Sequence, residues 1–107
     1  MKIDKRELEK PIVKKADGAF ATLKEVLEGP VRVVASMGPE DYKDLALARF
    51  ETMDPDKVIS IVGKGSFSKD QILMEIKRDT EVGNIFVKME EDFIKYLLNK
   101  RGEIDVP

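Results

Sequence analysis

The residues whose types and spacing are best suited to chemistry lie between Gly63 and Lys69, in the order Gly-Lys-Gly-Ser-Phe-Ser-Lys. A glycine-rich turn that leads into a helix exposes backbone N–H groups at the positive end of the helix dipole, where anions bind. Lysine and serine side chains in the same stretch add further hydrogen-bond donors. The candidate residues for binding a phosphate or nucleotide are therefore Gly63, Lys64, Gly65, Ser66, Ser68 and Lys69.

Known phosphate loops match this stretch only in part. A Walker A loop places its lysine directly after the second glycine of its motif, whereas Lys64 here precedes Gly65. A dinucleotide-binding fingerprint needs a third glycine, and Ser68 stands at that position. The alternative is a plain turn from strand to helix, with glycines for positive φ and Ser68 as the helix cap. The sequence favours this alternative.

The acidic side chains do not form a metal-binding pattern. Glu90, Glu91 and Asp92 are consecutive, and successive helical residues point about 100° apart, so their carboxylates cannot all reach one ion. Asp54 and Asp56 flank a proline, but the remaining ligands of a calcium loop are missing. We therefore predict no metal site.

Cysteine and histidine are both absent from the 107 residues. Their absence excludes disulfides, thiol nucleophiles, zinc sites built from Cys and His, and acid–base catalysis by His. No nucleophile stands beside a base in a recognisable pattern. The sequence leaves catalysis by carboxylates, Lys, Tyr, Ser or Thr open, but it favours a non-enzymatic domain without a cofactor.

Length and charge predict one globular domain over residues 1–107. With 19 basic and 21 acidic residues the net charge is −2, so no overall field attracts nucleic acid. No run of about 18 apolar residues could span a membrane. Residues 1–7 lack the apolar segment of a secretory signal, and we expect a soluble, cytoplasmic protein. Abundant Lys and Glu with few Asn and Gln are typical of thermophile proteins.

The first part of the chain predicts one helix and one strand. Residues 1–16 are either a loosely attached arm or an edge element, and Ile12-Val13 is either the tip of a short strand or a packed part of the arm. Apolar residues at helical spacing predict a helix over 19–28, which Gly29 and Pro30 end. The β-branched segment 31–37 is apolar on both faces and predicts an interior strand.

The middle of the chain allows two interpretations. A helix over 40–53 begins with a proline and two acids and continues with apolar residues at helical spacing. The alternative is a strand over 45–53, joined by the turn at Pro55 to a buried strand over 58–62. The periodic spacing favours the helix.

Two helices complete the predicted α+β fold. Ser68 with Gln71 forms a capping-box pattern at the start of a helix over 69–78. A long helix follows over 81–101, and Gly83 in its first turn indicates close approach of a neighbouring element. The helices 19–28, 40–53, 69–78 and 81–101 pack on a small sheet of two to three strands. These are 31–37 and 58–62, with 11–14 or 45–53 as the third.

The last helix is apolar over a wider face than one packing surface needs. Neighbouring elements of the same chain could cover this width, or a partner could. The candidate interface residues are Ile85, Met89, Phe93, Ile94, Tyr96, Leu97 and Leu98. The leading hypothesis is a domain that acts through protein association, as a homodimer or as a subunit of an assembly. The alternative is a ligand-binding or regulatory domain that holds a phosphate or nucleotide at Gly63 to Lys69.

Overall fold

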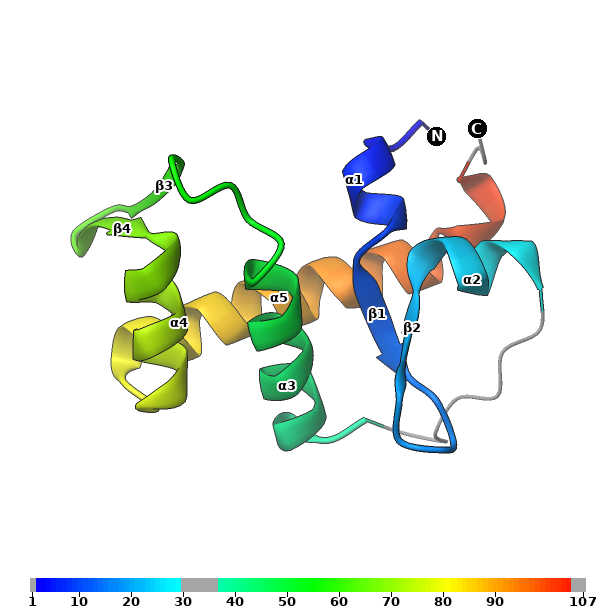
Figure 1. Ribbon diagram of the computed structural model, residues 1–107, viewed down its shortest axis with the longest axis horizontal. Helices are drawn as coiled ribbons and strands as arrows, with labels where there is room; N and C mark the ends of the chain where they lie inside the picture. Colours follow the sequence, from blue (N-terminus) through cyan, green and yellow to red (C-terminus); the bar gives the residue numbers. More distant parts are fainter. Residues whose placement is uncertain (1, 30–36, 105–107) are drawn as a thin grey trace.

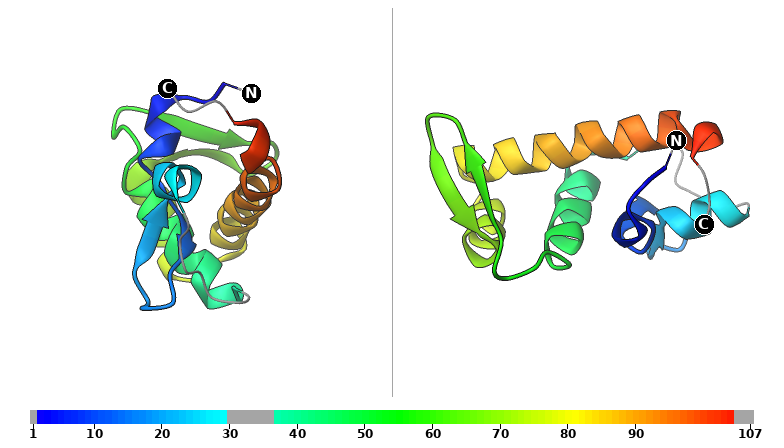
Figure 2. Two further views of the ribbon diagram at one scale, coloured as in Figure 1. Left: turned by 90° about the vertical axis from the view of Figure 1, so that its right-hand side faces the viewer. Right: turned by 90° about the horizontal axis from the view of Figure 1, so that it is seen from above.

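A long C-terminal helix organises the chain. The computed structural model describes residues 2–29 and 37–104, and its longest element is α5, Glu81–Asn99. Figure 2 shows α5 along one side of the molecule, with the hairpins and the other helices on the other side. Two antiparallel two-stranded sheets accompany the helices, which confirms the predicted α+β class. The sheets are separate, so the prediction of one small sheet was wrong.

The N-terminal segment forms a short helix, a hairpin and a second short helix (Figure 1). These elements are α1, Lys5–Leu8; β1, Pro11–Lys14; β2, Phe20–Thr22; and α2, Leu23–Glu28. Of the two alternatives for a third strand, the one at 11–14 is present, and the helix predicted over 19–28 begins only at Leu23. Phe20 pairs with Lys14 across the hairpin, and Thr22 closes a capping box with Glu25, so residues 20–22 are extended.

The first sixteen residues contribute to the core. Leu8, Ile12 and Val13 are all buried, so this segment is packed rather than loosely attached. The strand predicted over 31–37 lies outside the described residues except for Met37, which is not in a strand.

The helical interpretation of the middle segment is confirmed. Helix α3 covers Pro39–Phe50, which excludes the alternative strand at 45–53, although the helix ends three residues earlier than predicted. The Asp41 carboxylate accepts hydrogen bonds from the Gly38 N–H at 2.9 Å and from the Lys14 ammonium at 3.0 Å. These two contacts fix the start of α3 and tie it to β1.

A second hairpin occupies the stretch around the glycines. Strand β3, Val58–Ile61, pairs with β4, Gly65–Ser68, so a second strand precedes the helix that we expected directly after the turn. Gly63 and Gly65 have positive φ, which lets the chain reverse within three residues. The strand at 58–62 was also expected to be buried, but Val58 is 61% exposed, because only one face of this hairpin is covered.

Helices α4, Lys69–Lys77, and α5 pack closely against each other, with α4 crossing the start of α5 (Figure 1). A Cβ atom on Gly83 would lie 2.1 Å from the carbonyl oxygen of Glu75, so the close approach predicted from Gly83 is confirmed. Thr80 caps α5 by accepting a hydrogen bond from the Gly83 N–H, and its hydroxyl also bonds Glu75. A short 3₁₀ helix, η1, Arg101–Glu103, follows α5.

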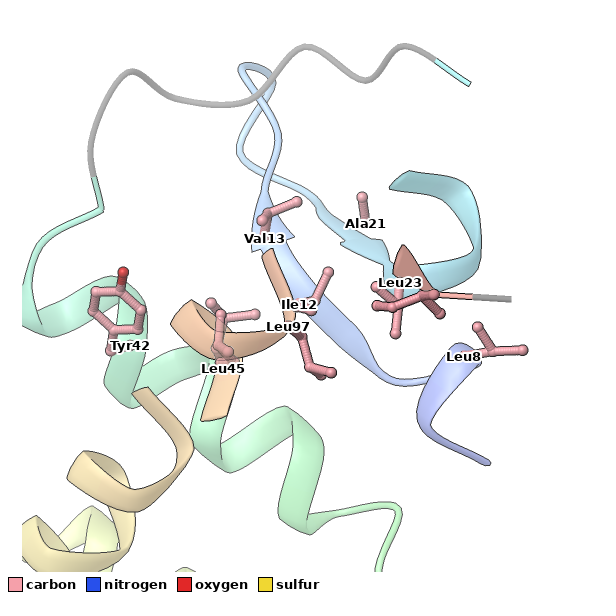
Figure 3. Close-up of a cluster of buried hydrophobic side chains, with 10 residues drawn as sticks. Leu8, Ile12, Val13, Ala21, Leu23, Tyr42, Leu45 and Leu97 are labelled. Carbon is pink, nitrogen blue, oxygen red and sulfur yellow. The ribbon is translucent and has the colours of Figure 1, made fainter. Parts of the chain in front are cut away.

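Buried apolar side chains form two clusters, and α3 and α5 contribute to both. The first cluster joins the N-terminal hairpin to the C-terminal part of α5 (Figure 3). Its buried members are Leu8, Ile12, Val13, Ala21, Leu23, Tyr42, Leu45, Ile94, Leu97 and Ile104. The second cluster joins α3, α4 and the start of α5, with members Ala46, Phe50, Ile72, Leu73, Ile76 and Phe86.

Candidate functional site

The predicted anion-binding residues do not share one loop. Gly63 and Lys64 lie in the hairpin turn, whereas Gly65, Ser66 and Ser68 belong to β4. The Lys64 ammonium lies 3.0 Å from a Glu81 carboxylate oxygen. The hydroxyls of Ser66 and Ser60 are hydrogen-bonded at 2.7 Å across the strands.

The start of α4 is capped from within the chain. The Ser68 N–H donates to the Gln71 side chain at 2.8 Å, and the Gln71 N–H donates to the Ser68 hydroxyl at 3.3 Å. The capping box predicted from sequence is therefore present. The Lys69 ammonium lies 3.9 Å from Glu51. Anion binding at this turn stays a prediction, and two of the N–H groups that would support it already have partners.

The predicted interface residues fall into covered and exposed groups. Ile94 and Leu97 are buried in the first cluster, and Phe93 and Leu98 pack against it from its edge. Ile85 is partly exposed, while Met89 and Tyr96 are 46% and 49% exposed. Of the seven predicted residues, Met89 and Tyr96 are therefore exposed, and Ile85 is partly exposed without packing against either apolar cluster.

These three residues lie in one row with Asp92, and we call Ile85, Met89, Asp92 and Tyr96 the α5 stripe. At about 100° per residue, the four positions fall within about 60° of each other around the helix. A broad, shallow depression covers the N-terminal half of the stripe, lined by Glu81, Asn84, Ile85, Lys88, Met89 and Asp92.

Charged side chains flank the α5 stripe. The Lys88 ammonium lies 2.9 Å from Asp92 and 3.2 Å from Glu91, and these two carboxylates raise the pKa of Lys88. The Lys95 ammonium lies 3.3 Å from Glu91 and 5.4 Å from the centre of the Tyr42 ring. The apolar row therefore has a polar rim, as protein interfaces commonly do.

Arg49 is an ionic centre that the sequence analysis missed. Its side chain is 2% exposed, and its guanidinium donates to Glu7 at 2.9 Å, to Glu90 at 3.2 Å and to the Pro11 carbonyl at 3.1 Å. It also lies 5.6 Å from the centre of the Phe93 ring. The available signal was a charged residue in the otherwise apolar stripe of the predicted helix over 40–53.

A half-open cleft of about 430 Å³ lies beside Arg49, and we call it the Arg49 cleft. Its walls come from α1, the C-terminal end of α3, the segment 52–57, β3 and Glu90 of α5. Figure 1 shows α1 and the segment that leads into β3 on either side of the end of α3. No sequence motif marks this cleft, because its residues come from distant parts of the chain.

The consecutive acids have separate partners. Glu90 binds Arg49, Glu91 binds Lys88 and Lys95, and Asp92 binds Lys88. Within residues 2–29 and 37–104, no group of three or more acidic side chains is placed to hold a metal ion. None of the helices in the same residues combines the length and apolar character needed to cross a membrane.

Comparison with known proteins gives no functional lead. No protein-family model matches the chain, and no curated protein or solved structure shows significant similarity to it.

Proposed function

We propose that this domain acts through protein association, with the α5 stripe as its contact surface. The observation that supports the proposal is the near-half exposure of Met89 and Tyr96 in one row with Ile85. Methionine and tyrosine are enriched in protein interfaces, where they supply large contact areas. In Figure 2 no other described helix or strand lies against the outer side of α5, so a partner helix could lie there.

The partner that best fits the stripe is a second copy of the chain. In an antiparallel pair of α5 helices with a two-fold axis between Glu90 and Glu91, Ile85 lies opposite the partner's Tyr96. Met89 then lies opposite the partner's Asp92. Lys88, the residue before Met89, then lies beside the carboxylate of the partner's Asp92. The two-fold axis repeats this contact, so two pairs of opposite charges form between the chains. Such self-complementarity is what a symmetric dimer requires.

Light scattering over a concentration series tests the proposal. We expect the mass to rise from the 12.1 kDa of one chain towards twice that value as the concentration increases. A mass of one chain at every concentration would exclude the homodimer. A different protein would then be needed to cover the stripe, as in a subunit of a larger assembly.

A further inference from the structure

The Arg49 cleft has the size and composition of a small-molecule site. Its volume of about 430 Å³ lies within the range in which proteins hold small ligands. Phe50, Met53 and Ile59 provide apolar walls. The cleft also lies beside α3, which like α5 contributes to both apolar clusters, and ligand sites commonly form where separately packed parts of a protein meet.

Most charges along the cleft already have partners within the chain. Arg49 is neutralised by Glu7 and Glu90, and Glu7 also binds Lys10 at 2.7 Å. The Asp54 carboxylate accepts a hydrogen bond from the Asp56 N–H at 2.9 Å. These contacts stabilise the fold and leave little capacity for a ligand.

Two cations along the cleft are not used in this way. The Arg6 guanidinium and the Lys57 ammonium form no ion pair with another described residue, and both side chains are exposed. Arg6 comes from α1 and Lys57 from the segment before β3, so they reach the cleft from different walls. Glu9 is the one lining carboxylate without a partner among the described residues. Counted over all the side chains that line the cleft, four cations (Arg6, Lys10, Arg49 and Lys57) stand against three carboxylates (Glu9, Asp54 and Glu90), so the lining has a net charge of plus one.

We propose that the Arg49 cleft binds a small organic anion, with an apolar body against Phe50, Met53 and Ile59. Its carboxylate or phosphate lies between Arg6 and Lys57. A guanidinium binds a carboxylate or phosphate through two parallel hydrogen bonds, and an ammonium adds a compact positive charge. Burial of the apolar body supplies the remaining affinity. The cleft shares no residue with the α5 stripe, so this site is independent of the proposed association.

The test is an NMR titration of the full ¹⁵N-labelled chain with octanoate, octyl phosphate and octanol, each below its aggregation limit. We expect octanoate and octyl phosphate to shift amide signals of residues 50–59 and of α1. Comparison of these two anions distinguishes a carboxylate ligand from a phosphate ligand. Octanol, which has the same apolar body without the charge, should bind at least about tenfold more weakly, the size of one charge-assisted contact.

Variants of the two cations complete the test. Arg6→Gln and Lys57→Gln should each weaken anion binding about tenfold, again the size of one charge-assisted contact. Lys77→Gln is the matched control, because this exposed lysine on α4 also forms no ion pair among the described residues. The amide spectra of the variants show directly whether each remains folded. Equal affinity for octanol and octanoate, unchanged affinity in Lys57→Gln, or shifts confined to other surfaces would each overturn the proposal.

Discussion

At the scale of single residues, Arg49 is the most consequential polar side chain. It is buried and connects α1, β1 and α5 through three hydrogen bonds. Loss of one partner from a buried ion pair leaves charges without compensation and costs about 3–5 kcal/mol. Arg49→Ala should therefore lower the free energy of unfolding by about 3 kcal/mol in urea titrations. The exposed Arg78→Ala should change it by less than about 0.5 kcal/mol, and a similar small change for Arg49→Ala would contradict this account.

Gly83 provides a second test at the residue scale. Alanine favours helix over glycine by about 1 kcal/mol, so propensity alone predicts that Gly83→Ala stabilises α5. The added Cβ would meet the Glu75 backbone, which cannot move without separating α4 from α5. We expect net destabilisation of about 2 kcal/mol by thermal or urea unfolding. Gly102→Ala is the control, because nothing lies within 4 Å of its added Cβ. Greater stability of Gly83→Ala than of the parent chain would refute the close contact.

Asp41 makes stability depend on acid pH. The Gly38 N–H and the Lys14 ammonium hydrogen-bond its carboxylate and hold its pKa below the usual 3.8. The folded-state pKa is therefore the lower one, so the stabilisation is complete above 3.8 and is lost as the pH falls through the folded pKa. Asp41→Asn should flatten the loss of stability in this acid range, whereas Asp44→Asn on the same helix should not. An Asp41 titration by NMR with a midpoint above 3.8 would contradict the assignment.

At the scale of elements, the sequence predicted structure well where the signal was local. The cap of α4 was evident because Ser68 and Gln71 are three residues apart, and α5 was evident from its long apolar period. Strand β4 was missed because its glycine and serine residues are typical of a turn and a helix cap, and β2 was missed because its residues continue the spacing of the following helix. Phe20 has helical spacing to Leu23, and only β1 makes it extended.

The candidate site was predictable in part for the same reason. Periodicity placed seven apolar residues on the last helix, but Ile94 and Met89 are indistinguishable without the elements that cover one and leave the other exposed. The Arg49 cleft could not be predicted, because the partners of Arg49 are 38 to 42 residues away in the sequence.

The antiparallel arrangement of α5 helices can be tested by cross-linking. The chain has no cysteine, so any disulfide forms between introduced residues. A mixture of Ile85→Cys chains with Tyr96→Cys chains should give a mixed disulfide dimer under mild oxidation, observed on non-reducing gels. Each variant alone should cross-link much more slowly, because its two cysteines lie at opposite ends of the contact. Rapid cross-linking of each variant with itself would indicate a parallel pair instead.

At the scale of the whole molecule, α5 has two different roles. Its inner side completes both apolar clusters, while its outer side carries the α5 stripe without a covering element among the described residues. A long helix with its outer side open would gain further burial by pairing with a second chain. Association through α5 is the central claim that follows from this arrangement.

Sedimentation equilibrium of Met89→Glu beside Met74→Glu tests that claim most directly. Met74 is 41% exposed on α4, close to the 46% of Met89, so the two substitutions match in residue type and exposure but lie on different surfaces. We expect Met74→Glu to associate like the parent chain. In Met89→Glu, a buried carboxylate should weaken the dimer at least about 100-fold, the factor that corresponds to about 3 kcal/mol. Equal dimerisation of the two variants would contradict the claim.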